Sequence, residues 1–177
     1  MAGRRQVALI RGINVGKAKR VAMADLRALM ERQGHSDVRT LLNSGNVVYS
    51  SKQPAARAAV ALERGLAEKL EVPARVTALE AADFARAAEQ HPLAAMAWDL
   101  SRLMVAFLMG AGDRRRLTPL VGQDWYPEAL ALGRGVAYLW CPDGILDSSL
   151  MKAIEGARGD GVTIRNWATV GKIAALL

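Results

Sequence analysis

The residues best suited to bind a ligand stand in a glycine-rich segment near the start of the chain. Arg11, Asn14 and Lys17 lie within seven residues of one another. Glycine frees backbone amides to face an anion, and arginine and lysine add positive charge. The segment is one residue too short for an NTPase phosphate loop, and Ala18 stands where the magnesium-binding Ser or Thr belongs. Three interpretations stay open: a nucleotide-binding loop, a generic anion site, or a structural turn in which Asn14 caps backbone groups.

Two asparagines flank a second candidate position, the pair Ser44-Gly45. Asn43 precedes this pair and Asn46 follows it. The Ser-Gly pair is typical of a hairpin turn, whereas asparagine is depleted in strands. The two asparagines therefore either cap the backbone or bind a ligand through hydrogen bonds.

A third motif, Arg165-Asn166-Trp167, stands near the end of the chain. Asparagine is a good helix N-cap. Arg165 and Trp167 could instead offer a cationic and aromatic surface to a base or phosphate, although Trp167 also fits the apolar stripe of a last helix. Asp143 is the only acid expected near this motif, and its Pro-Asp-Gly turn accounts for it.

The sequence predicts no metal, no cofactor and no assigned catalytic residue. His35 and His91 lack Cys or His partners at metal-ligand spacing, and no nucleophile elbow is present. Cys141 follows the apolar run VAYLW and is expected to be an unreactive core residue. An RNA-recognition sheet needs stacking aromatics, and the first and third predicted strands contain only Tyr49.

The charge of the chain favours an anionic partner, either a small molecule or a nucleic acid. The formal net charge is +7 and the pI is near 10.1. Residues 1–91 carry 15 Lys and Arg against 9 Asp and Glu, whereas residues 92–177 carry 9 against 8. The excess therefore belongs to the first half, although a general richness in arginine would also produce it.

The hydropathy of the chain bounds its class. Hydrophobic residues make up 51% of the 177, which suffices for a proper core. No run approaches the roughly 18 apolar residues of a membrane span, and charge returns soon after the first apolar residues. We therefore expect a cytoplasmic protein without a membrane partner, and the sequence leaves its oligomeric state open.

Apolar periodicity predicts the same order of elements in two halves, residues 1–91 and 92–177. In the first half the expected strands are 5–11, 38–43, 46–50 and 74–79, with helices at 23–33, from Pro54 to before Pro73, and at 81–89. In the second half the expected strands are 102–109, 128–133, 136–141 and 162–165, with helices at 113–121, 148–157 and 167–177. The predicted fold is α+β, with two consecutive βαββαβ (ferredoxin-like) halves, mainly antiparallel sheets and a C-terminal helix. That helix would bury Trp167, Val170, Ile173 and Leu177.

This topology fixes which loops can meet. The split-βαβ arrangement has strand order 4-1-3-2, in which the first and third strands are neighbours. In the first half, Arg11, Asn14, Asn43 and Asn46 would therefore converge at one sheet edge. In the second half, the Asp143 turn and the Arg165-Asn166 motif would share the other edge.

The stretches RGINVG, SGNVVY, PDG and TIRNW, in this order, resemble an uncharacterised bacterial family, the domain of unknown function number 1697. The resemblance spans almost the whole chain. It implies a cytosolic bacterial protein with two similar α+β halves and no established activity. The chain departs from the family pattern at Ser149, where a lysine is usual, and at Trp140, where a histidine is frequent.

Three classes of function follow from these observations. The leading hypothesis is a binding protein for an anionic ligand, in which Arg11, Asn14 and Lys17 contact phosphate while Asn43 and Asn46 orient the ligand. The second is an enzyme acting on a small phosphorylated or polar substrate, with Arg165, Asn166 and Asp143 completing its site. The third is a protein-interaction or structural module that pairs through a sheet edge.

Overall fold

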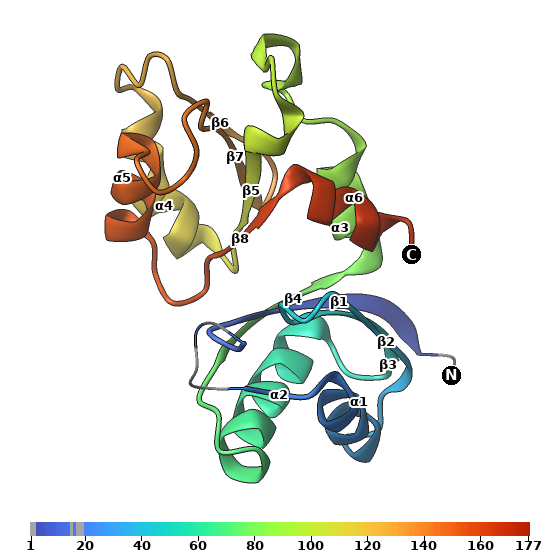
Figure 1. Ribbon diagram of the computed structural model, residues 1–177. Coiled ribbons are helices and arrows are strands. Elements are labelled where there is room, and N and C mark those ends of the chain that lie inside the picture. The colour runs from blue at the N-terminus through green and yellow to red at the C-terminus, as the bar shows by residue number, and fades with distance from the viewer. Residues whose placement is uncertain (1–2, 15, 17–19) are drawn as a thin grey trace. The chain divides into compact units, whose positions relative to one another are not determined.

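The computed structural model describes residues 3–14, 16 and 20–177 (Figure 1). The chain forms two compact units: residues 1–85 together with 173–177, and residues 86–172. The predicted boundary lies after residue 91, and the two units divide between residues 85 and 86, inside the helix that follows the fourth strand.

The first unit contains a four-stranded sheet with two helices on one face. Its elements are β1 (Arg4–Arg11), α1 (Met23–Arg32), β2 (Ser36–Leu41), β3 (Asn46–Ser51), α2 (Ala55–Lys69) and β4 (Arg75–Glu80). The strand order is β2-β3-β1-β4, and all neighbours are antiparallel. The predicted order, with β1 between β4 and β3, is confirmed.

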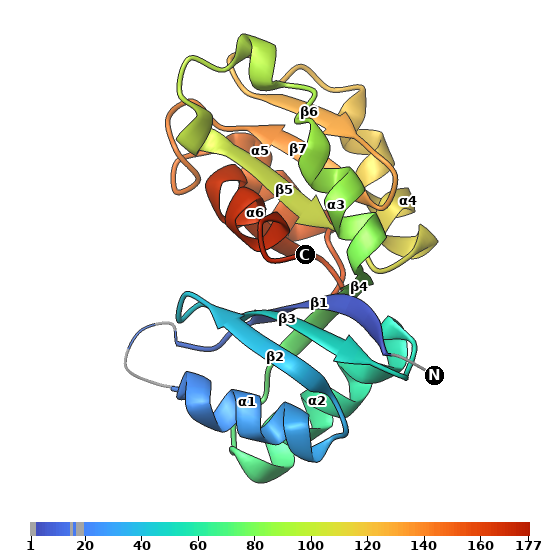
Figure 2. The same ribbon diagram turned by 90° about the vertical axis from the view of Figure 1, so that its right-hand side faces the viewer.

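The second unit repeats this arrangement. After α3 (Ala81–Glu89) come two short 3₁₀ turns, η1 (Ala94–Met96) and η2 (Leu100–Arg102). The following elements are β5 (Leu103–Phe107), α4 (Ala111–Val121), β6 (Ala129–Leu132), β7 (Val136–Trp140), α5 (Ser149–Ala157), β8 (Thr163–Asn166) and α6 (Trp167–Ala174). The strand order is β6-β7-β5-β8, again fully antiparallel (Figure 2). The predicted α+β fold with two ferredoxin-like halves is thereby confirmed.

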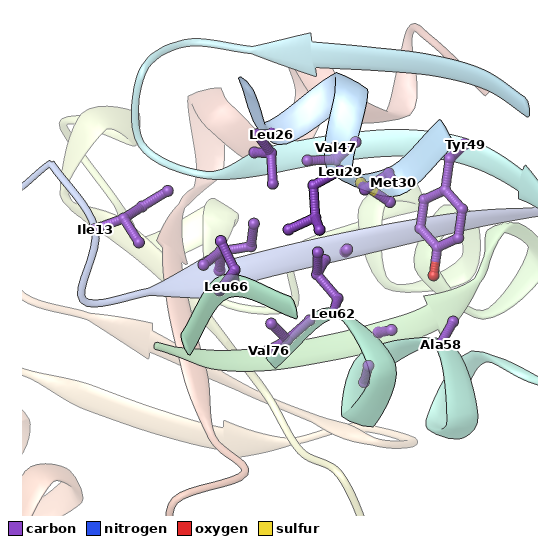
Figure 3. Close-up of a cluster of buried hydrophobic side chains, with 14 of the residues drawn as sticks. Ile13, Leu26, Leu29, Met30, Val47, Tyr49, Ala58, Leu62, Leu66 and Val76 are labelled. Atoms are coloured by element: carbon purple, nitrogen blue, oxygen red, sulfur yellow. The ribbon is translucent and has the colours of Figure 1, made fainter. Parts of the chain in front are cut away.

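The apolar faces of α1 and α2 form the core of the first unit. Leu26 and Met30 of α1 and Leu62 and Leu66 of α2 are buried against Tyr49 and the other inward side chains of β1, β3 and β4 (Figure 3). Gly34, at a φ of 86°, ends α1, because glycine adopts this left-handed conformation without strain. Pro54 and Pro73 flank α2 as predicted.

The second unit has an equivalent core. Leu117 of α4 and Ile154 of α5 pack against Leu139 and Cys141, and all four are fully buried. The opposite face of this sheet carries α3 and α6 (Figure 2). There the Tyr138 hydroxyl donates a hydrogen bond to the carbonyl oxygen of Ala87 at 3.1 Å.

One backbone contact recurs in both units. In the first, the Ile10 amide donates to the Gly45 carbonyl oxygen at 2.7 Å, and in the second the Leu108 amide donates to the Gly135 carbonyl oxygen at 2.9 Å. Both glycines lie in the loop before the third strand of their sheet and have positive φ values, 78° and 72°. The repeat therefore extends from element order to the geometry of the turns.

Two local expectations are corrected. The β2–β3 connection is a four-residue loop, residues 42–45, rather than a two-residue turn, because Leu42 leaves the strand with a φ of 57°. The last helix ends at Ala174, and Leu177 is exposed instead of buried. Val170 and Ile173 are buried as predicted. No helix in the described part of the chain is long and apolar enough to cross a membrane.

Candidate anion-binding site

Three arginines surround one hollow of the first unit. Arg11 ends β1, Arg75 begins β4, and the two are paired across the antiparallel ladder. Arg64 reaches the same hollow from α2, which packs beside β4. The hollow has a volume of about 610 Å³ and is lined by Arg11, Gly12, Val60, Glu63, Arg64, Ala67, Pro73, Ala74 and Arg75. We call it the arginine groove.

Glu63 is the one carboxylate among the residues that line the groove. Its Oε1 accepts a hydrogen bond from the Val76 amide at 2.8 Å, and its Oε2 lies 3.6 Å from Nη1 of Arg75. The carboxylate thus anchors the start of β4 and one guanidinium. Three arginines against one acid leave the groove positively charged.

Asn14 holds the glycine-rich loop together. Its Oδ1 accepts a hydrogen bond from the Val21 amide at 2.8 Å, and its Nδ2 donates to the carbonyl oxygens of Val21 at 3.0 Å and Asn43 at 2.7 Å. The residue adopts a left-handed φ of 56°, which asparagine tolerates better than most residues. The amide therefore joins the loop to the β2–β3 connection, as in the structural-turn interpretation.

The other residues of the first motif have separate positions. Arg11 lines the groove, whereas Lys17 lies outside the described residues. Asn43 has an exposed side chain, and only its carbonyl oxygen contacts Asn14. Asn46 is fully buried, and its Nδ2 donates to the Leu41 carbonyl oxygen at 3.1 Å and to Ser44 Oγ at 2.9 Å. The structure brings Asn14 and Asn43 together, and the geometry of Asn46 favours a backbone-capping role.

The Arg165-Asn166-Trp167 motif shapes the junction of β8 and α6. Asn166 Oδ1 accepts a hydrogen bond from the Thr169 amide at 2.8 Å, which is the N-cap geometry. Arg165 is partly buried, its Nη1 donates to the Ile164 carbonyl oxygen at 3.0 Å, and burial lowers its pKa to about 10. The half-buried Trp167 ring meets His91 edge-on, with centroids 5.2 Å apart. Asp143 is exposed in a turn that the Gly144 amide closes onto the Cys141 carbonyl oxygen.

A polar cluster that was not predicted from the sequence includes Cys141, whose Sγ is hydrogen-bonded to Ser148 Oγ at 3.6 Å. Ser148 is the N-cap of α5, and its Oγ accepts from the Met151 amide at 2.8 Å and donates to the Glu128 carboxylate. Glu128 Oε2 accepts from the Leu150 amide at 3.0 Å. Burial raises the pKa of the Cys141 thiol, so the nucleophilic thiolate is disfavoured. This cluster caps α5, and Cys141 is buried as predicted.

Both histidines are buried. His91 Nδ1 accepts from the Leu93 amide, which leaves Nε2–H to donate to the Met104 carbonyl oxygen at 3.1 Å. His35 meets the Tyr49 ring edge-on, and neither of its ring nitrogens has a hydrogen-bond partner among the described residues. Burial lowers the pKa of each imidazole. Among the described residues, no three His, Cys, Asp or Glu side chains are grouped as a metal site.

Arg64 and Arg75 were not predicted as site residues. Arg64 is a polar position of an amphipathic helix, and Arg75 is the first residue of a strand. The feature that brings them together is the packing of α2 on β4. This packing follows from the topology and leaves no motif in the sequence.

The fold and the groove define a duplicated ferredoxin-like α+β protein whose first unit carries a basic surface hollow. The chain belongs to a family described as protein of unknown function (DUF1697), whose sequence model matches residues 4–138. It is similar to the structure of the conserved bacterial protein SP0830 from Streptococcus pneumoniae, with 25% sequence identity, a TM-score of 0.76 and coverage of 98% of each chain. No functionally curated protein matches it.

Proposed function

We propose that the protein binds an anionic, phosphate-bearing ligand in the arginine groove. The observation that carries this proposal is the grouping of Arg11, Arg64 and Arg75 around one hollow with a single, already engaged acid. A guanidinium presents a planar set of donors that matches the oxygens of a phosphate. Two strand ends and a packed helix hold the three arginines, so their backbone positions are fixed before a ligand arrives.

The binding residues in this proposal differ from those expected from the sequence. Arg11 stays in the site, and Arg64 and Arg75 join it. Asn14 and Asn46 take the role of shaping the neighbouring loops, because their amides already bind backbone groups. The contacts around the glycine-rich segment thus support a structural loop beside the groove more than a phosphate loop.

The first test is binding of a fluorescein-labelled single-stranded oligonucleotide of about 12 nucleotides, with ATP as a small-molecule probe in parallel. For single strands, log Kobs falls with log salt by about 0.7 for each phosphate contact. We expect Arg64→Gln to weaken binding by about tenfold or more, since a hydrogen bond to a charged group contributes about 1.5–3 kcal/mol.

The matched control is Arg32→Gln. Arg32 is an exposed arginine in the last turn of α1, outside the groove lining, so this variant loses the same charge elsewhere in the first unit. The proposal requires Arg64→Gln to weaken binding more than Arg32→Gln does. Equal effects of the two variants, or no binding of either probe near physiological salt, would contradict it.

A further inference from the structure

The arginine groove continues along the outer face of α2. A second hollow of about 450 Å³ is lined by Ala56, Arg57, Val60, Ala61 and Arg64. Val60 and Arg64 line both hollows. The two therefore form one open trough that runs from the N-terminal part of α2 toward the β1–β4 edge.

We propose that this trough takes an extended phosphodiester chain, the backbone of a single-stranded nucleic acid, rather than a single phosphate group. This inference rests on the proposed function. Its first support is the spacing of the charges: Arg57 and Arg64 are separated by two helical turns, or roughly 10 Å at 1.5 Å per residue. That distance corresponds to about three nucleotides of a stacked strand.

The second support is the balance of charge along the trough. Its lining residues include Arg57, Arg64, Arg75 and Arg11, against the single acid Glu63. Within the described chain, the side chains of Arg57 and Arg64 make no hydrogen bond or ion pair. Both guanidiniums can therefore turn toward a ligand without first breaking an internal contact.

The third support is the floor of the trough. Along α2, the trough is lined by the small side chains of Ala56, Ala61 and Ala67 and by Val60, which is 67% exposed. Small side chains let a backbone approach the helix closely. No aromatic residue lines either hollow, so bases have no stacking platform. The recognition is therefore of the phosphate backbone and independent of base sequence.

The test is a length series. Unlabelled thymidine oligonucleotides of about 2, 4, 8 and 12 nucleotides compete with the labelled strand for the wild-type protein and for Arg57→Gln. We expect affinity to rise by about tenfold or more between the shortest and longest strands. Arg57→Gln should lower the affinity for the longest strand by at least about fivefold. It should leave the affinities for ATP and for the dinucleotide unchanged.

The outcomes separate the two proposals. One outcome is that ATP or the dinucleotide binds in an Arg64-dependent way, whereas longer strands bind with no higher affinity and Arg57→Gln has no effect. The groove then binds a small anion, and an extended chain is excluded as its ligand. If no probe binds in an Arg64-dependent way, both proposals fail. A strong preference for one base sequence at equal length would also overturn the inference, because a backbone-only trough cannot discriminate bases.

Discussion

At the scale of single residues, the asparagine side chains of the candidate motifs bind backbone groups, as those of Asn14, Asn46 and Asn166 do. Asn14 alone binds three backbone groups of two different segments. Only an amide fits this position, because the side chain must both accept from an N–H and donate to two carbonyl oxygens. An aspartate in its place would set a negative charge against two carbonyl oxygens.

Asn14→Ala tests this role. The variant loses three hydrogen bonds, each contributing about 0.5–1.5 kcal/mol, and forces alanine into a left-handed conformation. We expect the free energy of unfolding to fall by about 2–4 kcal/mol, measured by urea denaturation. Asn43→Ala is the control, since the exposed Asn43 side chain is not needed for its carbonyl contact. Comparable losses in both variants would show that Asn14 is not the connecting residue.

At the scale of elements, both units have the same hydrogen bond to a glycine carbonyl oxygen in the loop before the third strand, but the space around the glycine differs. A Cβ on Gly45 would lie 2.8 Å from the Ile10 Cβ and 2.9 Å from the Ile10 carbonyl oxygen. A Cβ on Gly135 would meet nothing within 4 Å. The repeat thus provides two glycines with nearly the same φ, of which only one is sterically confined.

The variants Gly45→Ala and Gly135→Ala separate backbone strain from crowding. Each forces a positive φ on alanine, at a cost of about 1–2 kcal/mol. Gly45→Ala adds an overpacking cost of about 1–3 kcal/mol, so we expect it to lower the free energy of unfolding by the larger amount. Chemical denaturation of both variants checks this. An equal loss would mean that the first turn relaxes away from Ile10.

The predictability of the fold and of the site differs for a physical reason. Buried strands such as β1 and amphipathic helices such as α2 carry their periodicity in consecutive residues, so the order of elements and the strand order were predicted correctly. Arg64 and Arg75 line the same groove because α2 packs on β4, and no local sequence pattern contains this packing. The predicted length of the β2–β3 loop was wrong because Leu42, an apolar residue, adopts a left-handed conformation that its residue type disfavours.

At the scale of the whole molecule, each unit contains one buried histidine. His35 belongs to the first unit and His91 to the second, and burial lowers the pKa of both from 6.5. The unfolded chain therefore binds protons more readily than the folded one does. Above about pH 6.5 the imidazoles are neutral in both states, and the free energy of unfolding has its full value. As the pH falls from there toward the lowered pKa values of the folded state, the unfolded chain takes up protons first and the free energy of unfolding falls.

We expect the free energy of unfolding to fall between pH 7 and pH 5.5, with a slope approaching about 1.4 kcal/mol per pH unit for each histidine. His35→Phe and His91→Phe should each reduce that slope. At pH 7.5, His35→Phe should retain stability because the ring nitrogens of His35 have no hydrogen-bond partner in the described part of the chain, whereas His91→Phe loses two hydrogen bonds. Unfolding curves at several pH values provide the measurement, and an unchanged slope in both variants would contradict this account.

The assignment of residues 173–177 to the first unit has a consequence for protein synthesis. Arg5 in β1 donates a hydrogen bond to the carbonyl oxygen of Leu176, so this contact forms only after 171 further residues have been translated. At bacterial or eukaryotic elongation rates of about 5–20 residues per second, roughly ten seconds separate the emergence of β4 from that of residue 176. During this interval the nascent first unit holds its sheet and its two helices but lacks these contacts. It is then more exposed to chaperones and proteases than after residues 173–177 have joined it.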